Sequence, residues 1–171
     1  HYTLPLFSVS LALISKNEIV LAIIYDPMRD EFFSAIKGQG MWLNSQKIKR
    51  PEQPNTLKQS MAFVDFKRLS IPIKLSLVKQ PPYKSQRNVG SCALEWAWLA
   101  AGRVQLLLHG KEKYWDYAAG VLLNREAGGQ SQTLEAEAVC NWSLDARSVV
   151  AASTVELFDQ WADCIKKTTT N

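Results

Sequence analysis

A single stretch decides how this chain folds: Tyr114-Trp115-Asp116-Tyr117-Ala118-Ala119-Gly120-Val121-Leu122-Leu123-Asn124-Arg125-Glu126-Ala127-Gly128-Gly129. Its small and apolar residues recur at helical spacing, which predicts a helix over residues 116–127. Gly128-Gly129 ends that helix, because glycine accepts the left-handed conformation found after many helices. Asp116 is predicted to be the N-cap, since its carboxylate can accept hydrogen bonds from free backbone N–H groups. The same carboxylate could coordinate a metal ion, and the stretch alone leaves both roles open.

The composition is that of a globular protein. The chain has 171 residues, of which 47% are hydrophobic and 21% charged, so a single domain over residues 1–171 is expected. The net charge of +4 permits anionic ligands. The lysines and arginines are spread along the chain, however, so no nucleic-acid partner is expected.

The cysteines and apolar runs indicate the compartment. Cys92, Cys140 and Cys164 are far apart and have no metal-finger spacing, so they are interpreted as free thiols in a reducing, cytoplasmic environment. The longest apolar runs lie near residues 4–14 and 19–25 and are shorter than the roughly 20 residues of a membrane span. No signal peptide is visible, and no membrane association is expected.

The first part of the chain predicts an antiparallel meander. Strands are expected at residues 6–15, 18–25, 31–36 and 41–44, because β-prone runs alternate there with turns. The turn residues are Lys16-Asn17, Asp26-Pro27 and Gly38-Gln39-Gly40. The second strand is almost entirely apolar, which predicts that both of its faces are covered.

The remainder of the chain predicts alternating strands and helices. Strands are expected at residues 60–64, 104–109 and 148–152, and helices at 71–78, 92–101, 116–127 and 153–165. The helix at 92–101 is apolar almost all round, with Glu95 as its one charge, so it is expected between two layers. These elements predict a layered α/β architecture, with a frayed end over residues 166–171.

Individual residues give weak chemical signals. The loop Arg87-Asn88-Val89-Gly90-Ser91 precedes a helix, whose free N–H groups favour anions. Ser91 could equally serve as a plain helix cap. His109 at a strand end is typical of a surface or hydrogen-bonding residue. There is no Ser/His/Asp set, P-loop or complete G-x-G-x-x-G motif in the sequence.

The combination of segments is far more specific. Four segments, in order, resemble the C-terminal portion of the inositol monophosphatase family of magnesium-dependent, lithium-sensitive phosphatases. They resemble its K-G-x-G-x-x-x-N turn, its G-S/T-x-A-x helix start, its A-x-G-R/x turn and its W-D-x-A-A-G…E-A-G-G signature, at residues 37–44, 90–94, 101–104 and 115–129. The resemblance covers about residues 4–165 and implies the αβαβα sandwich of sugar phosphatases.

The resemblance also implies a function. It makes the chain part of a phosphatase that hydrolyses a small inositol, polyol or sugar phosphate with Mg²⁺, which polarises the phosphate and activates a water. Asp116 inherits the roles of metal ligand and catalytic residue. The implied substrate-binding residues are Gly90, Ser91, Cys92, Ala93, His109 and Asp116. Members of the family are often homodimers, so a homodimer is the implied assembly.

Two departures from the family pattern modify this expectation. The upstream glutamate and the D-x-x-D-G-T motif, which supply the other metal ligands, are absent from the 171 residues, so the chain alone is expected to be inactive. His109 replaces the glutamate that binds inositol hydroxyls seven residues before Asp116. Nearby Lys111 and Lys113 favour a more anionic substrate. A bisphosphate nucleotidase of the same superfamily and a non-catalytic binding or regulatory module are therefore the alternatives.

Overall fold

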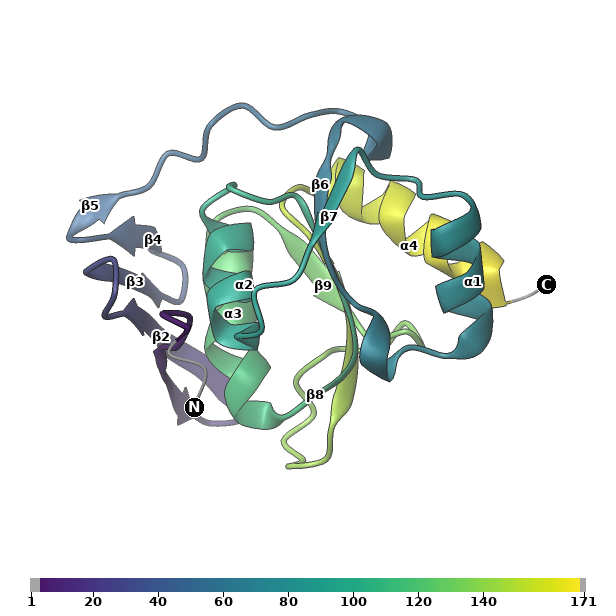
Figure 1. The fold of residues 1–171 in the computed structure, drawn as a ribbon. Helices are drawn as coiled ribbons and strands as arrows, with labels where there is room; N and C mark the ends of the chain where they lie inside the picture. Colours follow the sequence, from purple (N-terminus) through teal and green to yellow (C-terminus); the bar gives the residue numbers. More distant parts are fainter. Residues whose placement is uncertain (1–3, 170–171) are drawn as a thin grey trace.

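The N-terminal part of the chain, up to residue 47, forms an antiparallel sheet. A computed structural model describes residues 4–169, and its first sheet has the strand order β1-β2-β3-β4-β5 (Figure 1). The strands are β1 (Val9–Ser15), β2 (Glu18–Asp26), β3 (Glu31–Ile36), β4 (Gly40–Leu43) and β5 (Gln46–Lys47). Every neighbouring pair is antiparallel, which confirms the predicted meander. The two-residue β5 was not predicted.

The second sheet is mixed and carries the site described below. Its order is β7-β6-β8-β10-β9, with β6 parallel to both β7 and β8, and β10 antiparallel to both β8 and β9. The strands are β6 (Met61–Asp65), β7 (Ser85–Arg87), β8 (Leu106–Glu112), β9 (Gln130–Gln132) and β10 (Arg147–Ala152). The sequence pattern missed β7 and β9, because each has three polar residues and no apolar alternation.

Helices separate the two sheets and cover the second one. Helices α2 and α3 lie between the sheets, and α1 and α4 pack on the far side of the second sheet (Figure 1). The helices are α1 (Ile71–Lys79), α2 (Cys92–Ala100), α3 (Tyr114–Glu126) and α4 (Val155–Thr169), with short 3-10 turns at Leu57–Gln59 and Phe66–Arg68. The predicted α/β fold is confirmed, while α4 continues through residues that were expected to be frayed. None of these helices is long and apolar enough to cross a membrane.

The two central helices are in very close contact. Trp96 of α2 is fully buried and lies against Gly120 of α3, where an added Cβ would come within 2.3 Å of the indole Cγ. Glycine is therefore the one residue that this packing accepts without displacing Trp96. This contact explains the glycine of the W-D-x-A-A-G segment as a packing requirement.

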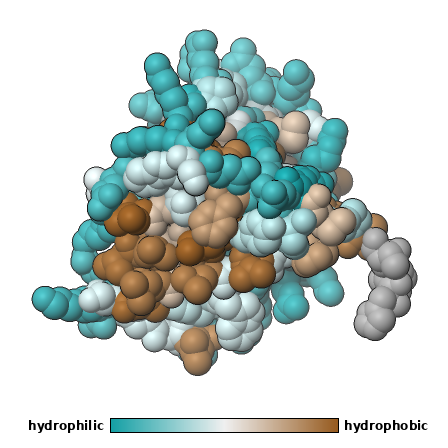
Figure 2. Space-filling view, turned by 90° about the vertical axis from the view of Figure 1, so that its left-hand side faces the viewer, coloured by the Kyte–Doolittle hydropathy of each residue, from teal (hydrophilic) through white to brown (hydrophobic). Residues whose placement is uncertain are grey.

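The outer face of the first sheet is uncovered. Ala22 and Ile24 of β2 are fully buried against the helices, whereas Leu11 and Leu13 of β1 and Phe32 of β3 are exposed. Figure 2 shows an apolar band on this side of the molecule. No helix within residues 4–169 packs on this face, so the prediction that both faces of β2 are covered is wrong for this part of the chain. The layers observed are sheet, helices, sheet and helices.

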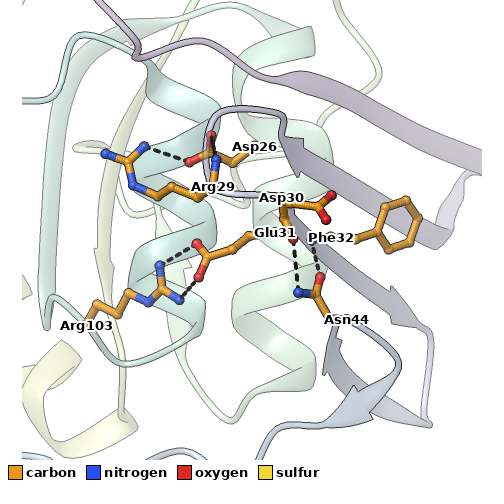
Figure 3. A network of polar contacts seen from close by, with 7 residues as sticks. All are labelled: Asp26, Arg29, Asp30, Glu31, Phe32, Asn44 and Arg103. Atoms are coloured by element: carbon orange, nitrogen blue, oxygen red, sulfur yellow. Dashed lines mark hydrogen bonds and ion pairs between the residues drawn. The ribbon is translucent and has the colours of Figure 1, made fainter.

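Three of the four family-like segments hold the scaffold together. The Glu126 carboxylate accepts hydrogen bonds from the backbone N–H groups of Gly38 and Gly40, at 2.8 and 2.9 Å. Asn44 bridges the β2–β3 turn, because its amide accepts from Phe32 N at 2.7 Å and donates to Asp30 O at 3.0 Å (Figure 3).

The A-x-G-R turn is tied to the same region. Arg103, which follows α2, forms a two-point ion pair with Glu31 at the start of β3 (Figure 3). Arg29 in the β2–β3 turn pairs with the buried Asp26 at 2.9 Å. Planar guanidinium–carboxylate pairs fix orientation as well as distance. The Arg103–Glu31 pair therefore sets the first sheet against the central helices, while the Arg29–Asp26 pair holds the β2–β3 turn.

Candidate functional site

The start of α3 holds Asp116 in a defined position. The helix begins at Tyr114 with Lys113 as its N-cap, so the prediction that Asp116 is the N-cap is wrong. Asp116 lies in the first turn, where its Oδ2 accepts a hydrogen bond from the Lys113 backbone N–H at 2.9 Å. The carboxylate closes the turn from inside the helix, because a side chain at this position can reach back to the N-cap N–H group.

The start of α2 is held by a different carboxylate. Ser91 is the N-cap, yet its side chain makes no capping hydrogen bond. The loop is tied by the buried Glu95, whose Oε1 accepts from Val89 N at 2.7 Å. Gly90 has a φ of +79°, a left-handed conformation that glycine adopts without strain. The Ser91 hydroxyl is thus left outside the cap.

These two helix starts border one pocket of about 380 Å³. The side chains and backbone of Gly90, Ser91, Cys92, His109 and Asp116 line it together. Ala93 does not: it is 7% exposed and packs in the core beneath the loop. The remaining lining residues are Asp65, Lys67, Arg68, Asn88, Glu95, Lys111, Lys113 and Ala146.

The strand pairing of the second sheet explains why His109 meets residues from elsewhere in the chain. Strands β6 and β8 run parallel, with Asp65 paired opposite His109, and Asp65 Oδ2 lies 3.5 Å from His109 Nε2. Sequence analysis missed Asp65, because a parallel pair joins residues far apart in sequence and leaves no local turn signal. The one sequence feature that could have indicated Asp65 as a site residue is its acidic side chain at the end of an otherwise apolar strand.

Burial shapes the protonation of the pocket's inner residues. Burial raises the pKa of Glu95 to about 7, although hydrogen bonds from Val89 and Gly90 oppose the shift. Burial lowers the pKa of His109, opposed by the charges of Asp65 and Asp116. It also raises the pKa of the Cys92 thiol well above its usual range, with nearby carboxylates adding to the shift.

The rim of the pocket is positively charged. Lys67, Arg68, Lys111 and Lys113 are exposed around its mouth. Clustered cations around a concave site attract anions and raise their local concentration. The arrangement therefore suits an anionic ligand whose less polar end reaches the inner wall.

The pocket also provides oxygen donors for a hard cation. Mg²⁺ is usually held by one or two carboxylates, with waters and substrate phosphates completing its octahedral shell. Asp116 and Asp65 bring carboxylates to the same pocket. This donor set fits such an ion.

Comparisons with known proteins agree with this fold. The model of the inositol monophosphatase family matches residues 2–168. The chain is 37% identical over 130 residues to the Nus factor SuhB of Escherichia coli K12, a match covering 74% of this chain and 49% of the relative. The chain thus spans about half the length of the curated relatives it matches.

Solved structures show the same arrangement. The extragenic suppressor protein suhB from Bartonella henselae has a TM-score of 0.81 at 28% identity, with 94% of this chain and 61% of that one covered. Inositol monophosphatase II from Staphylococcus aureus has a TM-score of 0.83 at 23% identity, with coverage of 94% and 59%. At that identity the second likeness speaks for the fold alone.

Proposed function

Because the chain belongs to the inositol monophosphatase family, we propose that its pocket is part of the active site of a magnesium-dependent phosphomonoesterase. The substrate class is a small inositol, polyol or sugar phosphate. One observation carries the proposal: the start of α2, His109 and Asp116 meet in a single pocket whose rim is cationic.

Each part of the pocket has a role in this proposal. Asp116 holds Mg²⁺, which when bound stabilises negative charge on the phosphate and lowers the pKa of a water. The free N–H groups at the start of α2 bind an anionic oxygen. Gly90, Ser91, Cys92 and Ala93 form that helix start, and the open left-handed turn at Gly90 leaves room for a ligand to approach the backbone.

His109 widens the proposed substrate class beyond inositol phosphate. A neutral imidazole offers one donor or one acceptor, whereas a carboxylate accepts from two hydroxyls. Burial keeps His109 neutral by lowering its pKa. The exposed Lys111 and Lys113 beside it favour substrates with extra negative charge, so a nucleotide bisphosphate is included.

The test is ligand binding and phosphate release by the 171-residue chain. Inositol 1-phosphate, glucose 1-phosphate, 2′-AMP, a 3′,5′-bisphosphate and inorganic phosphate are titrated with and without Mg²⁺, and phosphate release is measured on the same samples. We expect magnesium-dependent binding that weakens by at least about tenfold in Asp116→Asn, the scale on which metal sites lose affinity when a supporting group is removed.

A matched control keeps this test specific. Asp159→Asn removes an exposed carboxylate from α4, on the far side of the second sheet from the pocket, and should leave binding unchanged. Equal binding by wild type and Asp116→Asn, with and without Mg²⁺, would reject the metal-ligand role of Asp116.

A second candidate is a non-catalytic binding or regulatory module. The E. coli relative is named a Nus factor, which points to a partner in transcription, and the uncovered apolar face of the first sheet (Figure 2) is a surface of the kind that partners use. This reading predicts phosphate-ligand binding without turnover, and partner binding that Asp116→Asn does not alter.

A further inference from the structure

Behind the wall of the pocket, the buried Glu112 joins two lining residues, Cys92 and His109, in a group whose metal-binding chemistry the proposed magnesium role does not use. Cys92, His109 and Glu112 present a sulfur, a nitrogen and an oxygen that all lie within 4.8 Å of one another. Cys92 Sγ and His109 Nε2 are 3.5 Å apart. Glu112 is 1% exposed and His109 6%, so two of the three groups are inside the protein.

A bulge in β8 brings this group together. Residues three apart in a regular strand point to opposite faces, which would separate His109 from Glu112. Here Arg147 of β10 pairs with Glu112 and Val149 pairs with His109, so β10 advances two residues while β8 advances three. The extra residue resets the alternation and allows both side chains to meet Cys92 at the start of α2.

Within residues 4–169, Glu112 has no ion pair with a cationic side chain to account for its burial. Its Oε2 accepts a hydrogen bond from the Trp96 indole at 2.7 Å, and its Oε1 is buried without a hydrogen-bond partner in the described residues. A buried carboxylate oxygen with no partner is costly. A cation bound between Glu112, His109 and Cys92 would satisfy it.

The donor set and spacing suit zinc. Zn²⁺ takes cysteine, histidine and carboxylate ligands at about 2.3, 2.0 and 2.1 Å, and tetrahedral geometry then places sulfur and nitrogen about 3.5 Å apart. That is the separation of Cys92 Sγ and His109 Nε2. Asp65 Oδ2 lies at the same distance, 3.5 Å, from His109 Nε2, and can supply a fourth ligand on the side of the pocket.

We propose that Cys92, His109 and Glu112 form a binding site for a thiophilic divalent metal such as Zn²⁺, with Asp65 or a pocket water in the fourth position. Binding displaces the Cys92 thiol proton and the proton that Glu112 holds near neutral pH, because burial raises the pKa of Glu112 to about 8. The sulfur–hydrogen and oxygen–hydrogen bonds break, sulfur–metal and oxygen–metal bonds form, and both protons pass to solvent, so affinity rises with pH. The Trp96 indole N–H donates to the Glu112 carboxylate and holds it in place, as hydrogen-bond donors behind metal ligands commonly do.

This site is separate in chemistry from the magnesium role proposed for Asp116. Thiolate and imidazole favour zinc and related metals, whereas Mg²⁺ prefers oxygen ligands. The inference does not rest on the phosphatase function, because metal binding is measured without substrate. Zinc binding and phosphatase activity can therefore be measured separately in each variant.

The experiment is metal binding by the chelator-treated, reduced 171-residue chain. We expect one Zn²⁺ per chain in competition with a chromophoric chelator, and with Co²⁺ a near-ultraviolet thiolate-to-metal absorption band. Cys92→Ser should abolish that band, while Cys140→Ser, a matched change at another half-buried thiol, should retain it. His109→Ala and Glu112→Gln should weaken binding by at least about tenfold.

A measurement on the unmodified protein guards against misfolded variants. Zn²⁺ should slow alkylation of Cys92 by iodoacetamide, read by peptide mass spectrometry, and leave Cys164 unaffected. The proposal is overturned by the absence of stoichiometric binding, or by a cobalt band that survives Cys92→Ser. Binding with no thiolate band would likewise overturn it, because the metal would then lie elsewhere, for instance at His1.

Discussion

At the scale of one residue, Glu95 shows how burial in the fold changes the pKa of a side chain. Its side chain is 1% exposed, and it ties the α2 loop through the Val89 N–H. Burial raises its pKa from 4.5 to about 7. The folded protein therefore retains a proton that the unfolded chain has already lost, and this excess of bound protons sets the sign of the pH dependence.

We expect Glu95 to make the protein less stable as pH rises from about 4.5 to 7, with no further loss above that range. Each pKa unit is worth about 1.4 kcal/mol, so the total effect is on the order of 3 kcal/mol. The measurement is urea unfolding of wild type and Glu95→Gln, both chelator-treated, between pH 5 and 8.

The difference between the two proteins isolates Glu95 from other titrating groups. Wild type should lose stability relative to Glu95→Gln across this range, because the glutamine cannot ionise. A difference that stays constant with pH would show that Glu95 ionises normally in the folded state.

At the scale of elements, the contact between α3 and the β3–β4 hairpin joins two parts of the chain that sequence leaves unconnected. Both oxygens of Glu126 accept backbone hydrogen bonds, from Gly38 and Gly40. Hydrogen bonds to a charged acceptor contribute more than neutral ones. The first sheet is therefore fastened to the last turn of the central helix.

Glu126→Ala should lower the free energy of unfolding by about 1–3 kcal/mol, because two hydrogen bonds to a charged group are lost. Denaturant unfolding measures the change. Glu18→Ala is the matched control, since Glu18 pairs with Lys37 in the same sheet through an exposed ion pair, and such pairs contribute little. Equal effects of the two substitutions would contradict the structural role of Glu126.

At the scale of the whole molecule, the uncovered face of the first sheet is a broad apolar surface (Figure 2). Several of its large apolar side chains are at least 41% exposed: Val9, Leu11, Leu13, Phe32 and Ile36. Contiguous apolar surface of this kind marks interaction sites or a tendency to aggregate. The homodimer implied by the family resemblance stays a prediction, and this face is a surface through which the 171-residue chain can self-associate.

We expect the 171-residue chain to associate with rising concentration in sedimentation experiments, and Leu11→Lys to shift it towards monomer. Leu11 is 49% exposed in this face. The control is Leu75→Lys on α1, which is 51% exposed on the other side of the molecule. A similar shift from both substitutions would indicate a general solubility effect and exclude a specific role for the sheet face.

The sequence by itself determined the element types and the family. Periodicity placed the meander, α2 and α3, because local spacing of apolar residues reports directly on the face that each element buries. The family resemblance pointed to the segments containing Gly90, Ser91, Cys92 and Asp116. Periodicity misplaced the N-cap of α3, since Asp116 can reach the N–H group of Lys113 from inside the helix as well as from the cap position.

Only the tertiary structure decided which residues share a pocket and which family-like segments are structural. Asp65 reaches His109 through a parallel strand pair, and Glu112 joins Cys92 through a bulge in β8. Neither relation has a local sequence signal, because parallel pairing and bulges depend on contacts between distant strands. For the same reason Glu126 and Asn44, which the motifs alone could not distinguish from site residues, are seen to support the scaffold that holds Asp116 in place.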